Sequence, residues 1–329
     1  MNNKCLLLII QFVIFIEIFA FPIRYLDFYL PHTSASAIET AMGGLNVSSP
    51  NDRFLTLTNP ALLRRNSKTY FTLTVTRPAD KYNDFADFTD NDVYQHDNIL
   101  RAASLQSKRF GLAYQALASQ NILKNIDTGN TYQDFYLNQY TVAIADSAGR
   151  YDWGINGKII HGRIVYKTEE MNSINEFIDS SAFGYSFDIA LARQRGPLNF
   201  GFVIHDIYST VYWSGESNQN IRTRAVFGID SDFINSNIGI GINRRWLWND
   251  KAYYNVYYSY SKYFNNYREI QQATLRLGLA SQTFKNQDNI LFCLGMGYFY
   301  YFAYCDISIQ TRGWKANETQ YMLTITFGE

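Results

Sequence analysis

The sequence predicts an all-β protein, a transmembrane antiparallel β-barrel of about 14 strands with an N-terminal plug or hatch segment. Three observations support this prediction: an apolar N-terminal run, a period-two alternation of apolar and polar residues through most of the chain, and connections that alternate between long and tight. We expect residues 1–21 to be a signal peptide, residues 22–66 to form the hatch and residues 67–329 to form the barrel. A chain of 329 residues is long enough for one large barrel.

Composition narrows the classes of protein without choosing a fold. The formal net charge is zero, so the chain has no overall electrostatic attraction for nucleic acid. Aromatic residues make up 17% of the chain, with 26 Tyr and 24 Phe. Tyr in this abundance suits surfaces that are apolar on one side and wet on the other. A soluble β-sandwich has the same property, so that alternative stays open at this point.

The N-terminus has the pattern of a secretory signal. Lys4 precedes an apolar run from Cys5 to Phe21, and a basic residue before such a run is typical of signal peptides. We expect cleavage near Ala20 or Phe21, and an uncleaved anchor helix is the alternative. No later segment has the 18 or so consecutive apolar residues of a membrane-spanning helix. The pattern therefore predicts an exported chain.

The body of the chain alternates with the period of a β-strand. Between Ala182 and Arg193, large apolar residues at odd positions alternate with small or polar residues at even positions. The stretch from Ile221 to Phe233 has the same pattern. A sandwich would turn the apolar face inward, whereas a transmembrane barrel turns it outward to lipid. The polar face of the second stretch predicts a charged ladder in the lumen, formed by Arg222, Arg224, Asp230 and Asp232.

Connection lengths separate the sandwich from the barrel. Transmembrane barrels have short periplasmic turns and longer outer loops on alternate connections, and a sandwich does not require this rhythm. The expected long connections are 78–98, 120–134 and 166–181, and the tight ones are Lys108, Asp146–Arg150 and Gln194–Pro197. The even strand count places both termini in the periplasm. The expected strands are 69–77, 99–107, 109–119, 135–145, 151–165, 182–193, 198–210, 221–233, 236–247, 253–263, 268–281, 290–300, 303–312 and 318–327.

In the C-terminal region, the division of residues 290–312 into two strands rests on length alone. Residues 290–312 are about twice as long as one spanning strand, yet Tyr298–Cys305 contains no typical turn residue. On these two strands, Cys293 and Cys305 either face each other or are separate apolar thiols. The final strand has Phe327 near its end, and it resembles the last strand of bacterial outer-membrane proteins.

The sequence carries no recognised catalytic motif. Four histidines are present, but none lies in a zinc-protease pattern, and neither a nucleophile elbow nor a phosphate-binding loop occurs. We expect no enzyme activity, no metal site and no cofactor. Two histidines, His161 and His205, are expected to face the lumen. The acidic residues between Asp80 and Asp97 lack EF-hand spacing, which favours a solvated outer loop over a calcium site.

The segment from Ala41 to Leu63 breaks the alternation. It contains Gly43-Gly44, a pair that permits backbone conformations other residues resist. Asn is a good helix N-cap and Pro is favoured at the first helical position, so Asn59-Pro60 predicts the start of a short helix. A barrel of about 14 strands has a lumen too wide for its own side chains to fill. We therefore predict that this segment folds inside the barrel as a hatch.

The N-terminal segment resembles two known families. A plug before the first strand of a barrel of this strand number is similar to the FadL family of fatty-acid transporters. The short motifs resemble more closely the PorQ and PorV family of the type IX secretion system. The matching elements are Phe28–Pro31, Ser34–Ala37, Ala41–Gly44 and Asn59–Leu63. The Arg usual after Ser-Ala is absent, and the acidic pair usual before Asn-Pro is reduced to Asp52.

These resemblances imply functions that the residues alone do not. The PorQ and PorV resemblance implies a non-enzymatic outer-membrane component of a type IX-like secretion system, which docks secretion or attachment-complex proteins. The alternative, from the FadL resemblance, is a transporter of hydrophobic small molecules, and a third hypothesis is an outer-membrane hydrolase. The expected location is the bacterial outer membrane, with the lipid bilayer as a partner and no nucleic acid. The motif residues are Leu30, Pro31, Ser34, Ala41, Met42, Gly43, Gly44, Asn59, Pro60, Ala61 and Leu62.

Overall fold

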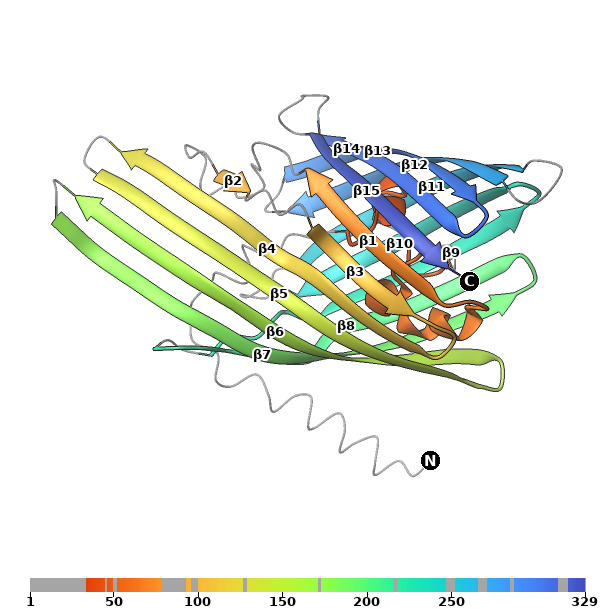
Figure 1. Ribbon diagram of the computed structural model, residues 1–329, viewed down its shortest axis with the longest axis horizontal. Helices are drawn as coiled ribbons and strands as arrows, with labels where there is room; N and C mark the ends of the chain where they lie inside the picture. Colours follow the sequence, from red (N-terminus) through yellow and green to blue (C-terminus); the bar gives the residue numbers. More distant parts are fainter. Residues whose placement is uncertain are drawn as a thin grey trace.

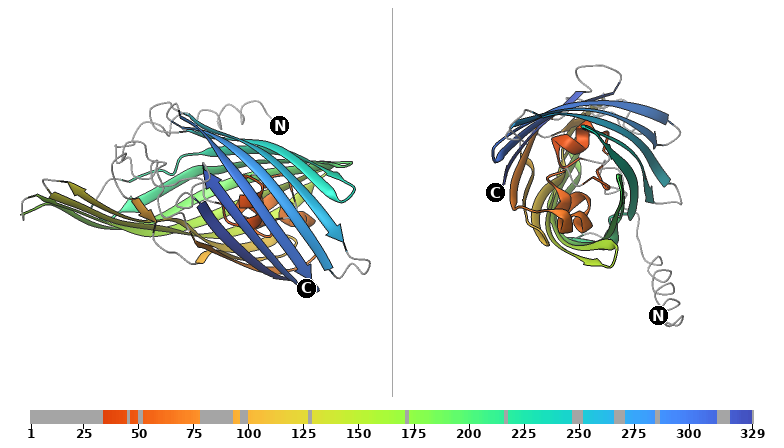
Figure 2. Two further views of the ribbon diagram at one scale, coloured as in Figure 1. Left: turned by 90° about the horizontal axis from the view of Figure 1, so that it is seen from above. Right: turned by 90° about the vertical axis from the view of Figure 1, so that its right-hand side faces the viewer.

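The computed structural model shows a closed antiparallel barrel with a short helical segment inside it (Figures 1 and 2). The structure describes residues 34–44, 46–49, 52–77, 93–95, 100–126, 129–170, 173–215, 218–246, 252–265, 271–284, 287–312 and 319–328. The expected signal peptide, Leu30, Pro31 and most of the expected loop at 78–98 lie outside the described residues.

Fourteen strands form the wall. Each pairs antiparallel with its neighbours, and β1 closes the barrel by pairing with both β3 and β15. The short β2 pairs with β4 beyond the part of β4 that pairs with β3, so it adds no strand to the wall. The predicted count of about 14 is confirmed. The strands are β1 (Tyr70–Arg77), β2 (Val93–Gln95), β3 (Leu100–Gln106), β4 (Phe110–Ile126), β5 (Gly129–Ala148), β6 (Tyr151–Glu170), β7 (Ser173–Arg195), β8 (Leu198–Trp213), β9 (Arg224–Phe233), β10 (Ser236–Trp246), β11 (Ala252–Asn265), β12 (Gln271–Phe284), β13 (Gln287–Tyr300), β14 (Ala303–Arg312) and β15 (Thr319–Gly328).

Two of the predicted long connections are wrong. Residues 120–134 and 166–181 are mostly strand, because β4 pairs with β5 as far as Ile126, and β6 pairs with β7 as far as Glu170. These two hairpins project beyond the other strands (Figure 1). Their polar composition led to the prediction of loops, since a strand that extends past the bilayer no longer needs an apolar outer face.

The division between β13 and β14 is confirmed. The chain turns at Tyr301 and Phe302, and Tyr301 adopts a left-handed φ of 56° without a typical turn residue. The register excludes a pairing of the two cysteines, because Cys293 lies opposite Gln310 and Cys305 lies opposite Tyr298. Cys293 is buried and Cys305 is exposed, and both are free.

The two faces of the wall differ in composition. Outward positions expose large apolar side chains such as Ile144 and Phe183, which are 56% and 58% exposed. Many inward positions are small or polar, among them Thr141, Asn156 and Ser186, all buried. An apolar outside and a polar inside are typical of a barrel in lipid and are the reverse of a soluble sandwich.

His161 is a correction to the expected lumen residues. The inward positions of β6 have even numbers, so His161 is exposed on the outer face, where its ring lies 6.2 Å from that of Tyr136. His205 is buried on the inner face of β8, as expected.

Candidate functional site in the barrel lumen

The described part of the hatch segment, residues 34–66, lies inside the barrel (Figure 2, right). It consists of helix α3 (Ala37–Ala41), helix α4 (Leu55–Thr58) and the 3-10 helix η2 (Pro60–Arg65). α3 packs against β12 to β15, and η2 packs against β5, β6 and β7. The segment therefore bridges opposite parts of the wall.

Short side chains start the helices of the hatch. Ser36 Oγ accepts a hydrogen bond of 2.9 Å from the Glu39 N–H, which caps α3. Asn59 Oδ1 accepts one of 3.0 Å from the Ala61 N–H, and Pro60 follows at the first position of η2. Asn59 Nδ2 also donates to the Val47 carbonyl at 2.6 Å, so this residue joins two parts of the hatch.

The Gly43-Gly44 pair allows the hatch to approach the wall closely. The φ values are 73° and 94°, in the left-handed region that favours glycine. A Cβ on Gly43 would lie 2.9 Å from the Leu279 carbonyl oxygen, and one on Gly44 would lie 3.0 Å from the Tyr257 ring. The wall has its own glycine, Gly278, directly at this contact. The strand glycines thus mark where hatch and wall meet.

The other motif residues fill this contact. Ala41, Met42, Pro60, Ala61 and Leu62 are all buried, whereas Ser34 is half-buried. Leu62 belongs to an apolar cluster that contains residues of both hatch and wall, including Val47, Ala143 and Val203. The motif residues that the structure describes are therefore packing residues of the hatch.

Charged and polar contacts anchor the hatch to the wall. The Arg53 guanidinium lies over the rings of both Tyr70 and Tyr304, 4.6 and 4.3 Å from their centroids. Arg65 Nε donates to Asp152 Oδ2 at 2.8 Å. At α3, the Ala37 N–H donates to Thr324 Oγ1 at 2.8 Å.

Two acidic side chains are buried within the hatch. Burial is the main cause that raises the pKa of Glu39 to about 8, and the nearby Asp52 charge adds to it. Burial also raises the pKa of Asp52 to about 6, against hydrogen bonds from Ser36 and from two backbone N–H groups. Glu39 Oε2 accepts from the Ala35 N–H at 2.8 Å. The hatch therefore contains groups whose charge state changes near neutral pH.

A polar layer crosses the inner wall above η2. Lys158 Nζ lies 2.6 Å from Asp188 Oδ1 and 3.0 Å from Asp206 Oδ1, and His205 Nδ1 lies 3.2 Å from Asp188 Oδ2. A register shift between β7 and β8 and a φ of 56° at Asp206 bring these groups together. Asn156 Nδ2 donates to both Asp188 and the Thr56 carbonyl, which links the layer to the hatch.

Beyond this layer, away from the tight turns, the inner wall becomes apolar. The side chains there are buried, and the registers of β5 to β8 place them on one face. The rings of Phe135 and Trp213 lie 6.2 Å apart. We define the inner apolar patch as Phe135, Leu137, Ile160, Ile164, Ala182, Val211 and Trp213.

Sequence reasoning missed this patch. Its strands were predicted, but their inner faces were expected to be small or polar throughout. One signal was present: Ile159 and Ile160 are adjacent, which makes both faces of β6 apolar at that height.

The predicted lumen charges do not form one ladder. Asp230 and Asp232 are held together by Asn199 and Asn237, each of which donates to both carboxylates at 2.8–3.0 Å. Arg224 lies opposite His205 on β8, six positions from Asp230. Six positions span roughly 20 Å of strand, which prevents direct pairing. Arg222 precedes β9, whose first residue is Arg224.

Among the described residues, no cluster of three or more His, Cys, Asp or Glu side chains is placed to hold a metal ion. No helix within the described ranges is long and apolar enough to cross a membrane.

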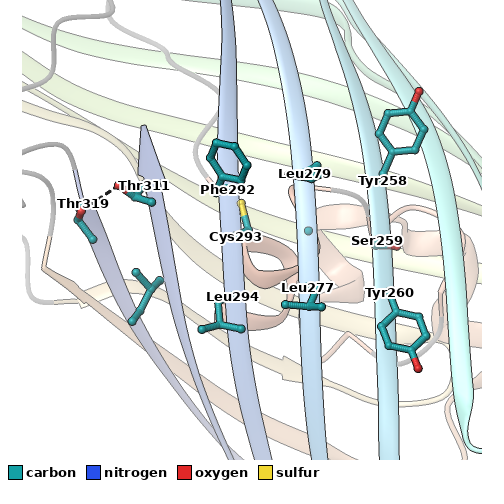
Figure 3. A pocket seen from close by; sticks show the side chains of 12 residues that line it. Tyr258, Ser259, Tyr260, Leu277, Leu279, Phe292, Cys293, Leu294, Thr311 and Thr319 are labelled. Carbon is teal, nitrogen blue, oxygen red and sulfur yellow. Dashed lines mark hydrogen bonds between the residues drawn. The ribbon is translucent and has the colours of Figure 1, made fainter. Parts of the chain in front are cut away.

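A hollow of about 810 Å³ lies on the wall at β11 to β15. Figure 3 shows Leu277, Leu294, Tyr258 and Tyr260 around it, with the hatch behind the strands. These four side chains are between 37% and 51% exposed and belong to the outward-facing set. The hollow is therefore part of the outer, lipid-facing surface and not of the lumen.

Comparison with known proteins gives a match in fold only. No protein-family model matches the chain, and no curated protein matches it. A Pseudomonas aeruginosa FadL homologue is 12% identical, with a TM-score of 0.61, over 91% of this chain and 99% of that one. The Ralstonia pickettii toluene transporter TbuX is 12% identical, with a TM-score of 0.61, over 89% and 97%.

The Pseudomonas putida toluene transporter TodX is 10% identical, with a TM-score of 0.60, over 92% of this chain and 99% of its own. None of these structures is a type IX secretion protein by its description. The predicted outer-membrane location agrees with the fold, because closed barrels with an apolar belt span outer membranes. The chain thus has the fold of the FadL-type outer-membrane barrels.

Proposed function

We propose that this protein is a non-enzymatic outer-membrane transporter that admits hydrophobic small molecules. The observation that carries the proposal is the inner apolar patch. A lumen that held only water would be polar throughout, whereas Phe135, Ile160 and Trp213 offer a buried apolar surface on the inner wall. The solved structures with this fold, which include toluene transporters, support the same class of substrate.

The hatch has a gating role in this proposal. It occupies the lumen near the tight turns, so a molecule that enters past the projecting hairpins meets the inner apolar patch before the hatch. Passage to the periplasm then requires the hatch to shift against the wall. The buried hydrogen bond from Asn156 Nδ2 to the Thr56 carbonyl joins wall and hatch, so such a shift would break it.

An uptake assay tests the proposal. Cells that express the protein should take up naphthalene faster than cells with the empty vector. The Leu137→Asn variant places a polar amide in the inner apolar patch and should slow uptake about tenfold, as expected for a loss of about 1.4 kcal/mol. Arg150→Gln, in an exposed tight turn, should leave uptake unchanged. Equal uptake by expressing and control cells would refute the proposal.

Docking of secretion or attachment-complex proteins is a second candidate function. Two observations favour it: the N-terminal motif resemblance and the projecting β4–β5 and β6–β7 hairpins (Figure 1). The described motif residues are mostly buried, so a partner would contact the hairpins and not the motif. A detergent pull-down from native membranes should recover secretion components with the intact protein, and lose them when both hairpins are shortened.

A further inference from the structure

Two polar atoms beside the inner apolar patch have no hydrogen-bond partner among the described residues. They are Trp213 Nε1, a donor, and Gln219 Oε1, an acceptor. Both residues are only 7% exposed. Buried polar atoms are nearly always paired in folded proteins, so each unpaired one requires an explanation.

The strand register places the two side chains next to each other. Val211 and Gln219 exchange backbone hydrogen bonds of 2.7 and 2.8 Å, which makes them a directly opposed pair. Opposed residues share a face of the sheet, so Gln219 lies on the inner face with Val211. Trp213 is two residues further along β8 on the same face, and such diagonal neighbours are within reach of long side chains.

The surroundings of this pair are apolar. Trp213 lies opposite Ala182 in the β7–β8 register. The Phe135 ring, on β5 beyond β7 and β6, is 6.2 Å away and tilted by 35°, and Phe135 lies opposite Ile164. A donor and an acceptor are therefore set side by side next to apolar side chains, while Ser180, opposite Ile164 on the same face, already donates to the Ser214 carbonyl at 2.8 Å.

We propose that this pair is a ligand subsite that recognises the hydroxyl group of a hydrophobic alcohol or phenol. A hydroxyl oxygen accepts from the indole N–H and its proton is donated to the amide oxygen, so one small group pairs both atoms. A carboxylate has no proton for Gln219, and a hydrocarbon leaves both atoms unpaired. The body of the ligand contacts Phe135, Ile160 and Ile164 in place of the contacts that now bury them.

The subsite rests on the proposed transport function only for how its ligand arrives, so binding and uptake are tested separately. Purified protein in detergent is equilibrated by dialysis with 1-naphthol or with naphthalene, which differ by one hydroxyl. The wild type should bind 1-naphthol about tenfold more tightly than naphthalene. Trp213→Phe keeps an aromatic ring and removes the N–H, and it should abolish that preference while naphthalene binding stays the same.

Two further variants keep the test decisive. Trp153→Phe makes the same substitution at an outward-facing position of β6 and should leave the preference intact. Gln219→Leu removes the acceptor and should reduce the preference for 1-naphthol as Trp213→Phe does. This variant tests the subsite independently if Trp213→Phe fails to fold. An equal affinity for the two compounds, or an unchanged preference in both subsite variants, overturns the subsite.

The same compounds separate the subsite from the transport function. Uptake of both compounds at equal rates, with no effect of Trp213→Phe on binding or uptake, would remove the subsite and leave the transport proposal standing. Hydroxyl-selective binding without uptake above the vector control would support the subsite and remove the transport proposal.

Discussion

At the scale of single residues, the hatch depends on positions where nothing larger fits. Gly43 combines a φ of 73° with a wall carbonyl 2.9 Å from its missing Cβ. Gly149, in the β5–β6 turn, has a similar φ of 64° but no atom within 4 Å of its missing Cβ. Comparing the two positions separates backbone strain from the loss of a close contact.

We predict that Gly43→Val weakens the hatch by about 2–3 kcal/mol, because valine resists a positive φ and meets the Leu279 carbonyl. Single-channel conductance in planar bilayers should rise, while insertion stays normal. Gly149→Val introduces the same strain of a positive φ without a close contact, and it should leave conductance unchanged. A wild-type conductance for Gly43→Val would show that the hatch does not control the lumen.

The buried acidic groups predict that the hatch responds to pH. Because the pKa of Glu39 is raised from its ordinary 4.5 to about 8, the docked hatch binds more protons than a released one. Docking is therefore strongest below pH 4.5 and weakens as the pH rises towards 8, by up to about 1.4 kcal/mol per pH unit. Asp52 adds to this between pH 3.8 and about 6. The charges of Arg101 and Arg224 oppose the shift of Glu39.

The measurement is conductance as a function of pH. It should be higher at pH 8.5 than at pH 5.5, and Glu39→Gln should flatten the dependence above pH 6. Asp179→Asn, at an exposed position of β7 where Asp179 pairs with Arg163 and not with the hatch, is the matched control and should keep the wild-type profile. A conductance that falls as the pH rises would mean that deprotonation of Glu39 does not release the hatch.

At the scale of elements, the hatch and the wall are separate in their hydrogen bonding. The backbone ladder of the wall closes from β1 to β15 without any residue of the hatch. An open edge in lipid would cost several kcal/mol for each unpaired group, so the wall must be complete by itself. The hatch contributes packing, the Arg53 contact and the Arg65–Asp152 ion pair, but no strand.

We therefore predict that deletion of residues 38–65 leaves a barrel that inserts into the membrane. The lumen should open, and single-channel conductance should exceed that of the intact protein. Failure of the deleted protein to insert would mean that the segment helps to form the wall. Insertion with unchanged conductance would mean that another part of the chain blocks the lumen.

The projecting hairpins predict the orientation of the barrel. Long extensions belong on the outer side and tight turns on the periplasmic side. In a Cys305→Ser background, Asn130→Cys near the tip of the β4–β5 hairpin should react with a membrane-impermeant maleimide on whole cells. Gly149→Cys, in the tight β5–β6 turn, should react only after lysis. The reverse pattern would invert the orientation.

At the scale of the whole molecule, closure of the barrel removes the open strand edge that would be costly in lipid. β1 and β15 pair over eight positions, from Tyr70 with Gly328 to Arg77 with Tyr321. Because every other strand of the wall is paired on both sides, this ladder leaves no edge in the wall.

We predict that the protein is heat-modifiable: boiled and unboiled samples in detergent should migrate differently on a gel. Leu323→Pro removes a ladder donor in the closing strand, opposite Val75, and should reduce the fraction that shows this shift. If the wild type shows one mobility and is recovered in the soluble periplasmic fraction, the chain is a sandwich and not a membrane barrel.

The alternation of side chains let the sequence predict much of this molecule. A strand turns its successive side chains to opposite faces, so the apolar positions of β7 and β9 were readable one residue at a time. The local preferences of Asn59, Pro60 and the Gly43-Gly44 pair likewise marked the hatch, because capping and positive φ depend on neighbours in the chain.

Register and phase were decided only by the tertiary structure. A shift of one residue exchanges the faces of a strand, which is why His161 points outward and why the two cysteines lie five pairs apart. The polar ends of β4 to β7 became strands because each had a partner with which to pair. The inner apolar patch and the Trp213–Gln219 pair combine residues from several strands, and no local pattern in the sequence brings such residues together.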